Sequence, residues 1–452
     1  VLYNPIDLAN AEYRRKTTED FNGSVRLTSP FLKNFSFRST FGYDHNQYTN
    51  RQFSDSITPL SIIQGARMPI AELDTVFART ITNSNVLTYT VNNWKGKHDF
   101  TVLLGEETYD YRTESRNDLF KGYPLFTSPN EAFKNTSLGT TFSGYPKLHK
   151  TRYTNLSFFG RINYSYKDRY LFSFNMRADG ASKFAPGNQW GFFPAGSFAW
   201  RAKKENFLKN VDFISDLKFR AGFGAVGNNR IQDYLYLATY SNDGTYYYGL
   251  NGQPVYGYFP VSLPKPNLEW EATLNRNLGV DISILKDRVS LSVDVYNNSS
   301  KHLLLNVPIA STYGYSTQIQ NVGKTSNKGV EFQLNTIVIQ KPKSNFRYDV
   351  NFNISFNRNK VLALGPNQTS FTTQGWSGVS GQPTDYIIKV GSPVSSMWGL
   401  VTDGFYKVDD FDYNSGTGQY TLKSGVVSDA SIIGSANVMP GRSEERRVGK
   451  EC

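Results

Sequence analysis

Two short motifs are the strongest candidates for chemistry in this chain, and neither has the surroundings that its chemistry needs. The stretch GFGAVG at residues 222–227 has the G-x-G-x-x-G spacing of a dinucleotide-binding loop, which holds a pyrophosphate between a strand and the start of a helix. The residues that follow, NNRIQDYLYLATYS, show no helical period. We therefore interpret Gly222 and Gly224 as positions inside a strand where another segment packs closely.

The second motif, DFDYNSG at residues 410–416, has the start of a calcium-binding loop. Its glycine comes one residue late, and position twelve is Thr421 rather than glutamate, so we predict a turn. The four histidines are isolated from one another, and the single cysteine is Cys452. No spacing therefore predicts a metal site, a cofactor or a nucleophile, and we expect that the chain is not an enzyme.

The composition of the chain favours β-strands. Hydrophobic residues make up 39% of the 452 residues, charged residues 19% and aromatic residues 15%. So many aromatic residues exclude a disordered chain and suit half-buried strands. No run approaches the ~18 apolar residues of a membrane helix. The net charge of +11 comes from scattered Lys and Arg residues, with no run longer than three and no RNA- or DNA-binding motif, so we predict no nucleic-acid binding.

The clearest strand signal is FRYDVNFNISFN at residues 346–357, where apolar and polar residues alternate without a break. Strands in globular proteins average ~5–6 residues, whereas a tilted strand that crosses a membrane needs ~9–11. We predict one continuous strand here, with Phe352 and Ile354 facing outward and Asn351 and Asn353 facing inward. Similar alternation occurs at 35–43, 156–166, 170–178, 217–225, 278–284, 289–295 and 330–334.

The connections between these segments alternate in length. Short turns are predicted at 95–97, 167–169, 286–287 and 341–344, and long loops at 111–153, 179–191, 227–272 and 297–328. Short periplasmic turns and long extracellular loops are typical of an outer-membrane β-barrel. Tyr164, Tyr166 and Tyr170 lie beside one short turn, where such a barrel carries its interfacial aromatic residues.

Alternation alone allows two architectures, a barrel with its apolar face in lipid or a soluble sandwich with its apolar face in a core. Strand length, turn pattern and the tyrosines favour the barrel. Its polar face would line the lumen, where basic side chains would attract an anionic substrate or pair with acidic groups, and small residues would let another segment approach. The predicted lumen-facing residues are Arg161, Asn163, Arg177, Lys218, Arg220, Gly222 and Gly224.

The two ends of the sequence differ from the rest. The chain begins with Val1, and its first residues do not contain a charged segment followed by an apolar one. We therefore expect no signal peptide in it. The last eleven residues, RSEERRVGKEC at 442–452, are strongly charged and contain no aromatic residue. We interpret residues 1–441 as the folded region and 442–452 as a non-native tail.

Several long blocks together resemble the barrel of the SusC/RagA-type TonB-dependent outer-membrane transporters of Bacteroidetes. They occur in the order found in the family and cover about half of the chain. The blocks are FFGRINYSYKDRYLFSFNMRADGASKFAPGNQWGFFPAGSFAWRAKKENFL (158–208), ISDLKFRAGFGAVGNN (214–229), PNLEWEATLNRNLGVDISILKDRVSLSVDVYNNSSKHLLLNVPI (266–309), NVGKTSNKGVEFQLNT (321–336) and GSPVSSMWGLVTDGFYK (391–407).

This resemblance implies an all-β, transmembrane, antiparallel β-barrel in the bacterial outer membrane, here as part of a 22-stranded barrel with a plugged lumen. Residues 1–441 would be an incomplete barrel region without its plug domain. The family imports oligosaccharide or peptide fragments, with TonB as the energy-transmitting partner, bound through the missing N-terminal region, and with a SusD-like surface lipoprotein. The alternatives are a passive porin or adhesin barrel and a soluble glycan-binding β-sandwich.

Overall fold

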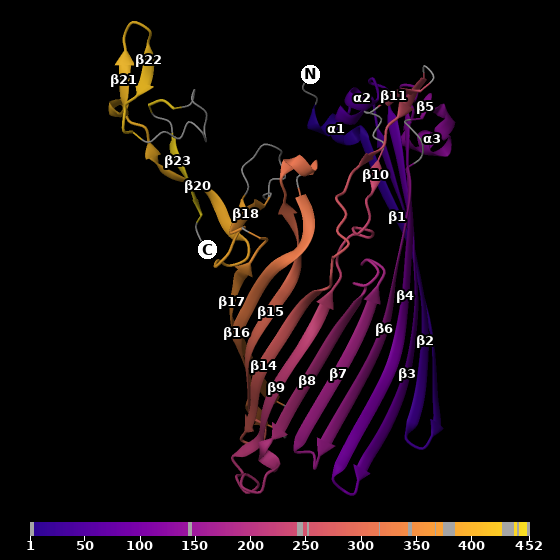
Figure 1. Ribbon diagram of the computed structural model, residues 1–452, viewed down its shortest axis with the longest axis vertical. Coiled ribbons are helices and arrows are strands. Elements are labelled where there is room, and N and C mark those ends of the chain that lie inside the picture. Colours follow the sequence, from indigo (N-terminus) through magenta and orange to yellow (C-terminus); the bar gives the residue numbers. More distant parts are fainter. Residues whose placement is uncertain are drawn as a thin grey trace. The chain divides into compact units, whose positions relative to one another are not determined.

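The structure is a computed structural model in which the chain forms two compact units, Val1–Trp270 and Glu271–Cys452, which are described separately (Figure 1). None of the helices among the described residues is both long and apolar enough to cross a membrane. The described residues are 4–142, 147–241, 247–250, 253–315, 317–341, 346–366, 368–373, 385–426, 438–440 and 443–449.

The first unit is built on long antiparallel strands that pair with their neighbours in the order β1-β2-β3-β4-β6-β7-β8-β9. Short α-helices and several two- to four-residue strands lie in its connections. The bounds are α1 Pro5–Asn10, β1 Glu12–Leu32, β2 Phe35–Ser54, α2 Pro59–Gln64, β3 Ile70–Trp94, β4 His98–Lys121, α3 Pro129–Lys134, β5 Thr141–Phe142, β6 Lys147–Tyr166, β7 Tyr170–Ala181, β8 Trp190–Arg201, β9 Ile214–Asn228, β10 Tyr240–Ser241, β11 Tyr247–Leu250, β12 Gln253–Tyr256 and β13 Phe259–Pro260.

The second unit repeats this design with long antiparallel strands in the order β14-β15-β16-β17, followed by short strands. Its bounds are β14 Glu271–Ile284, β15 Val289–Pro308, β16 Thr317–Lys341, β17 Phe346–Ala363, β18 Ser370–Thr373, β19 Tyr386–Lys389, β20 Ser396–Phe405, β21 Phe411–Asn414, β22 Gln419–Leu422 and β23 Ser443–Gly449. The predicted strand at 346–357 is confirmed as part of β17. Phe352 pairs with Leu334 and Asn353 with Gln333, so apolar and polar side chains lie on opposite faces.

The short turns lie where the sequence predicts them, except that most of the predicted turn at 341–344 falls outside the described residues. Residues 167–169 form the turn between β6 and β7, and Lys167 and Asp168 have φ angles of 52° and 50°. These left-handed values are uncommon for residues other than glycine, Asn and Asp, and they allow the chain to reverse within three residues. Consecutive long strands are therefore joined tightly at this end.

The predicted loops at 111–153 and 297–328 are wrong in extent. Strand β4 continues to Lys121 and β6 begins at Lys147, while β15 continues to Pro308 and β16 begins at Thr317. The loops at 179–191 and 227–272 agree with the ends of β7 and β9 and the starts of β8 and β14. The error arises because these strand ends do not alternate strictly between apolar and polar residues, so no pattern marks them as strands.

A small core lies at the loop end of the first unit. The buried side chains of Phe53, Ala71, Tyr123 and Ala132 pack together, and burial raises the pKa of the Tyr123 hydroxyl to about 12. Helix α3 begins with a capping box between Ser128 and Glu131, which satisfies backbone N–H groups at the first turn of the helix. The α3 connection is thus anchored to the strands rather than extended into solvent.

The GFGAVG and DFDYNSG motifs lie in a β-strand and in a β-hairpin, respectively. The GFGAVG stretch lies within β9, as expected, and no helix directly follows it among the described residues. The DFDYNSG stretch enters the hairpin of β21 and β22, and the Asn414 side chain accepts hydrogen bonds from the backbone N–H groups of Gly416 and Thr417. Residues 443–449, within the predicted tail, form β23 and pair with β20. The foreign origin of 442–452 stays a prediction.

Candidate functional site on the polar face

The seven predicted lumen-facing residues lie on one face of the first unit's sheet. Arg161 of β6 is opposite Asn175 of β7, Asn175 is opposite Ala195 of β8, and Ala195 is opposite Gly224 of β9. Because side chains alternate along each strand, every second residue from these positions shares their face. The set on this polar face is Arg161, Asn163, Arg177, Lys218, Arg220, Gly222 and Gly224.

Arg177 makes several contacts on the polar face. Its Nε lies 2.7 Å from Asp179 Oδ1, its Nη2 donates to Ser157 Oγ at 2.9 Å, and Nη2 lies 3.6 Å from Glu107 Oε1. The guanidinium also lies 5.4 Å from the centre of the Phe159 ring. The wall itself therefore neutralises much of the charge on Arg177.

A chain of polar side chains joins β6 to β7 beside Arg177. The guanidinium of Arg161 donates to Asn175 Oδ1, and Ser173 Oγ donates to Asn163 Oδ1 at 2.8 Å. Asn175 Nδ2 lies 3.5 Å from Ser173 Oγ, which links the two pairs. The partners in these contacts are neutral, so they do not offset the positive charge of Arg161.

The β9 members differ in size along the strand. Lys218 is opposite Arg201, Arg220 is opposite Ala199, and Gly222 is opposite Ser197. A Cβ atom added at Gly224 would lie 3.1 Å from the Cβ of Ala195, which is tighter than ordinary van der Waals contact. The polar face is thus bulky and basic toward the start of β9 and nearly flat toward its end.

The opposite face of the same strands is apolar and exposed. Phe172, Phe174 and Ile162 retain 48%, 48% and 49% of their accessible surface, and the rings of Phe172 and Phe198 lie 4.8 Å apart. In a soluble sandwich such side chains would be buried in the core. Their exposure argues against the sandwich and matches a wall that contacts lipid.

Aromatic and charged residues gather where this wall reaches the short turns. The Glu205 carboxylate accepts hydrogen bonds from Tyr170 Oη at 2.6 Å and Trp200 Nε1 at 3.2 Å, and it pairs with Arg169 at 2.9 Å. The Tyr170 hydroxyl, together with Trp200 and Arg169, holds the pKa of Glu205 below its ordinary value. Tyr166 stacks on Tyr170, as an aromatic belt at an interface would.

Sequence reasoning missed a cluster of tyrosines on the polar face, nearer the long loops. The ring of Tyr153 lies 5.4 Å from that of Tyr109 and 5.2 Å from that of Tyr111, and Tyr153 Oη donates to Tyr109 Oη at 3.3 Å. We call Tyr109, Tyr111 and Tyr153 the tyrosine cluster. Two of its members fall in the stretch 111–153 that was predicted to be a loop. The available signal was the recurrence of tyrosine two residues apart, at Tyr109 and Tyr111.

Polar groups surround the tyrosine cluster. Lys183 Nζ lies 4.6 Å above the Tyr153 ring, 3.7 Å from Asp233 Oδ1 and 2.9 Å from the Ile231 carbonyl oxygen, to which it donates. Asn155, directly opposite Tyr109, has a buried Oδ1 without a hydrogen-bond partner in the described structure, and Asp233 Oδ1 likewise accepts no hydrogen bond, although it pairs electrostatically with Lys183. Aromatic faces beside unmatched acceptors make a surface suited to a ligand with both C–H and O–H or N–H groups.

The barrel-type sheet, its two faces and its turns agree with one known family. A family model described as TonB dependent receptor-like, beta-barrel, matches residues 2–436. The chain belongs to this TonB-dependent receptor β-barrel family. It is therefore the barrel region of an outer-membrane receptor of the SusC/RagA type, as the sequence resemblance predicts.

Individual relatives place the chain within longer proteins. It is 31% identical to TonB-dependent receptor P3 of Formosa agariphila, over 92% of this chain and 40% of that protein. It is 33% identical to TonB-dependent receptor SusC of Bacteroides thetaiotaomicron, over 66% of this chain and 28% of SusC. The chain thus spans at most about 40% of the length of these curated relatives.

A solved structure supports the same fold. The RagAB peptide importer in its closed-closed state matches 98% of this chain and 45% of the other chain, with a TM-score of 0.76 and 20% sequence identity. At this identity the match shows the fold alone.

Among the described residues, no three His, Cys, Asp or Glu side chains gather as metal ligands.

Proposed function

We propose that the complete protein imports oligosaccharide or peptide fragments across the outer membrane as a TonB-dependent transporter, and that a SusD-like lipoprotein is its surface partner. The family match carries this proposal. Two proteins that the chain resembles support it, the TonB-dependent receptor SusC and the RagAB complex, which is a peptide importer. The proposal gives the chain no catalytic step and no cofactor.

Within this proposal, the tyrosine cluster is a contact surface for the imported fragment. Stacked rings bind the apolar faces of sugar rings or of peptide side chains, and Lys183, Asn155 and Asp233 supply polar groups beside them. All these groups lie within one unit and near the long loops, which supports a role in contacting a substrate that arrives from outside.

The polar face farther toward the turns is proposed to meet a plug. Arg161 keeps its charge, and the Gly222 and Gly224 positions allow a plug backbone to approach closely. Arg177 is expected to contribute less to plug contact than Arg161, because Asp179 and Glu107 already pair with it. Plug contact by the seven residues is a prediction for the full-length protein.

Uptake assays on the full-length gene product in cells with and without TonB test the transport proposal. We expect TonB-dependent uptake and a low resting conductance in planar bilayers. Conductance that is already high in the intact protein, or normal uptake without TonB, would favour the passive porin. The adhesin alternative predicts surface binding with no uptake in either strain.

The tyrosine cluster is tested separately with Tyr153→Ala. We expect weaker retention of the imported fragments by roughly ten-fold, since aromatic stacking contributes about 0.5–1.5 kcal/mol beyond area burial. The matched control is Tyr258→Ala, which removes an exposed tyrosine that is 71% accessible and outside the cluster. Equal retention by both variants would remove the cluster from the substrate path and leave TonB-dependent transport untouched.

A further inference from the structure

A row of basic residues crosses four neighbouring strands on the face opposite the tyrosine cluster. His45 of β2 is directly opposite Arg79 of β3, Arg79 is opposite Arg112 of β4, and Arg112 is opposite Arg152 of β6. We call these four residues the basic row. Like charges directly opposite one another destabilise a sheet, so this arrangement needs anions to balance it.

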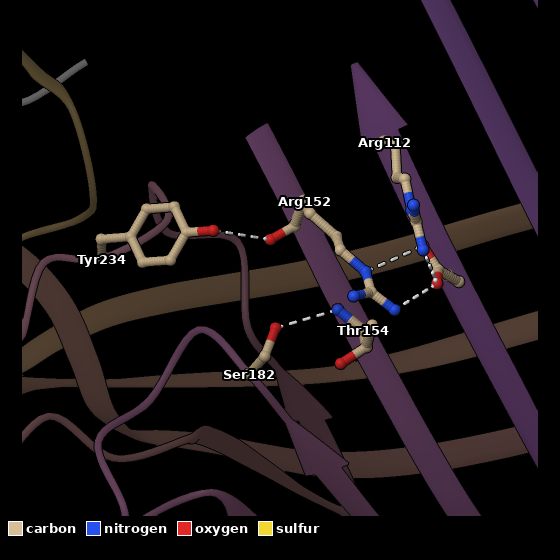
Figure 2. Close-up of polar contacts among 6 residues, drawn as sticks. Arg112, Arg152, Thr154, Ser182 and Tyr234 are labelled. Atoms are coloured by element: carbon tan, nitrogen blue, oxygen red, sulfur yellow. Dashed lines mark hydrogen bonds and ion pairs between the residues drawn. The ribbon is translucent and has the colours of Figure 1, made fainter. Parts of the chain in front are cut away.

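The acidic groups of the chain balance only part of this charge. Arg112 Nε and Nη2 lie 3.0 and 3.1 Å from the two carboxylate oxygens of Asp110, and Arg152 Nη2 lies 2.6 Å from the same carboxylate. Figure 2 shows Arg112 and Arg152 on adjacent strands around this shared acceptor. Both cations therefore depend on a single carboxylate.

The remaining cations are less well matched. Lys150 Nζ, one step farther along β6, pairs with Glu114 at 2.8 Å. Among the described residues, the half-buried side chain of Arg79 makes no hydrogen bond or ion pair. Three arginines and Lys150 thus face two carboxylates, which leaves an excess of about two positive charges with His45 beside them.

These side chains line a cavity that can hold a small anion. The cavity has a volume of about 610 Å³ and includes all four residues of the basic row, together with Lys150, Glu114 and Tyr234. Tyr234, from the loop after β9, donates its hydroxyl to the Arg152 carbonyl oxygen at 3.0 Å (Figure 2). The cavity is therefore bounded by the sheet and by a fixed loop residue.

The position of the basic row along the strands indicates what anion reaches it. Arg112 lies on the same face as Leu104, and β4 and β6 pair without a register shift between them. At about 3.4 Å per residue and a tilt of about 40°, Arg112 lies roughly 35 Å along the barrel axis from His98 at the turn end. An apolar band is about 25 Å tall, so the row lies at the level of the outer headgroups.

We propose that the basic row and Lys150 bind a phosphate group, carried by a lipid headgroup of the outer leaflet. Three guanidinium groups and an ammonium group around one cavity match a phosphate, which accepts several charge-assisted hydrogen bonds. The unpartnered Arg79 supplies the first such contact, and the partly engaged Arg112 and Arg152 supply others. The site is on the opposite face from the substrate surface, so its failure would leave the transport proposal intact.

Lipid retention by the detergent-solubilised full-length protein, measured by native mass spectrometry, tests the site. The probes are phosphatidic acid and, as a neutral-headgroup comparison, phosphatidylcholine. We expect preferential retention of phosphatidic acid, weakened about five-fold by Arg79→Gln and again by Lys150→Gln, since each basic side chain near an anionic surface contributes about 1 kcal/mol. Arg26→Gln, which removes an exposed cation from the polar face of β1, is the matched control and should change nothing.

Inorganic pyrophosphate separates the two sources of phosphate. Pyrophosphate that competes weakly with phosphatidic acid supports a lipid headgroup as the occupant, whereas binding as tight as that of the lipid would assign the cavity to soluble phosphates. Equal retention of the two lipids, or an equal loss in Arg79→Gln and Arg26→Gln, would overturn the site. Because Arg79 has no partner in the described structure, its replacement is expected to leave folding unchanged.

Discussion

The turn-side and loop-side halves of the long strands belong to one sheet but differ in their sequence patterns. On the turn side, Phe172 and Phe174 of β7 alternate with Ser173 and Asn175, and the two faces differ sharply. On the loop side of β4, Tyr111 alternates with Arg112, and both faces are polar. The backbone pairing is the same in both halves. Alternation therefore records what each face touches, lipid or water, and not the presence of a strand.

The largest effect that tests this comparison is expected from Phe172→Arg. This change places a cation on the apolar face two residues from the start of β7, and it should destabilise the folded barrel by about 2 kcal/mol, because the cost of a lipid-facing Arg is largest at the membrane midplane and falls toward the interfaces. Asn175→Arg, on the polar face of the same strand, should lose much less, because its only added cost is the like charge of Arg161 directly opposite. The folded fractions are read from heat-modifiable migration of the full-length protein, and equal fractions would refute the assignment of the two faces.

A smaller effect is expected from Arg177→Met on the polar face. The change leaves Asp179, whose side chain is 14% exposed, without its cation, and should destabilise the wall by about 1 kcal/mol. Urea unfolding of protein in lipid vesicles measures the difference. Arg161→Met is the control, because its partner Asn175 is neutral; a larger loss there would show that bulk rather than charge pairing matters.

Replacing an outward-facing phenylalanine with arginine on the loop side of the sheet should have little effect on folding. Phe21 of β1 is 60% exposed and lies directly opposite His45, at the level of the basic row. Phe21→Arg should cost roughly 0–1 kcal/mol because this level lies outside the apolar band. The measurement is again the folded fraction. A loss as large as that of Phe172→Arg would mean that lipid extends to the basic row, against both the comparison and the proposed headgroup level.

The smallest effect concerns the turn between β6 and β7. The hydrogen bond from Lys204, with Arg201 nearby, lowers the pKa of Asp168 below its ordinary value of 3.8. The stability that these contacts contribute is present above the ordinary pKa and is lost as the pH falls through the lowered pKa. Asp168→Asn should therefore cost a few tenths of a kcal/mol at neutral pH, since exposed pairs contribute little. Unfolding curves of the two proteins should converge in acid; a constant difference would contradict this.

The sequence predicted those parts of the fold in which one face meets lipid. The alternation at 170–178 and 346–357 located β7 and β17, and Lys167 and Asp168 marked a turn. It could not show that β4 runs to Lys121 or that β15 runs to Pro308, because neither stretch alternates between apolar and polar residues.

The candidate site shows the same division. Counting by twos from Arg161 and Gly224 placed all seven predicted residues on one face, since strand geometry fixes that relation. Register between strands is not encoded in this way. Only the pairing of Tyr111 with Tyr153 and of Arg112 with Arg152 reveals the tyrosine cluster and the basic row. Arg177 and Glu107 lie on different strands, so their contact could not be predicted from the sequence either.

One detail at the upper edge of β6 bears on how such receptors diversify. Where β7 ends, the hydroxyl of Ser182 accepts from the Thr154 N–H group at 2.9 Å, and Tyr234 donates to the Arg152 carbonyl oxygen (Figure 2). Side chains, rather than another strand, thus occupy the exposed backbone, which also protects this edge from pairing with a neighbouring molecule. A loop that is attached at single points can gain or lose residues between them without disturbing the sheet. The loop can therefore change by insertion and deletion while the sheet stays constant.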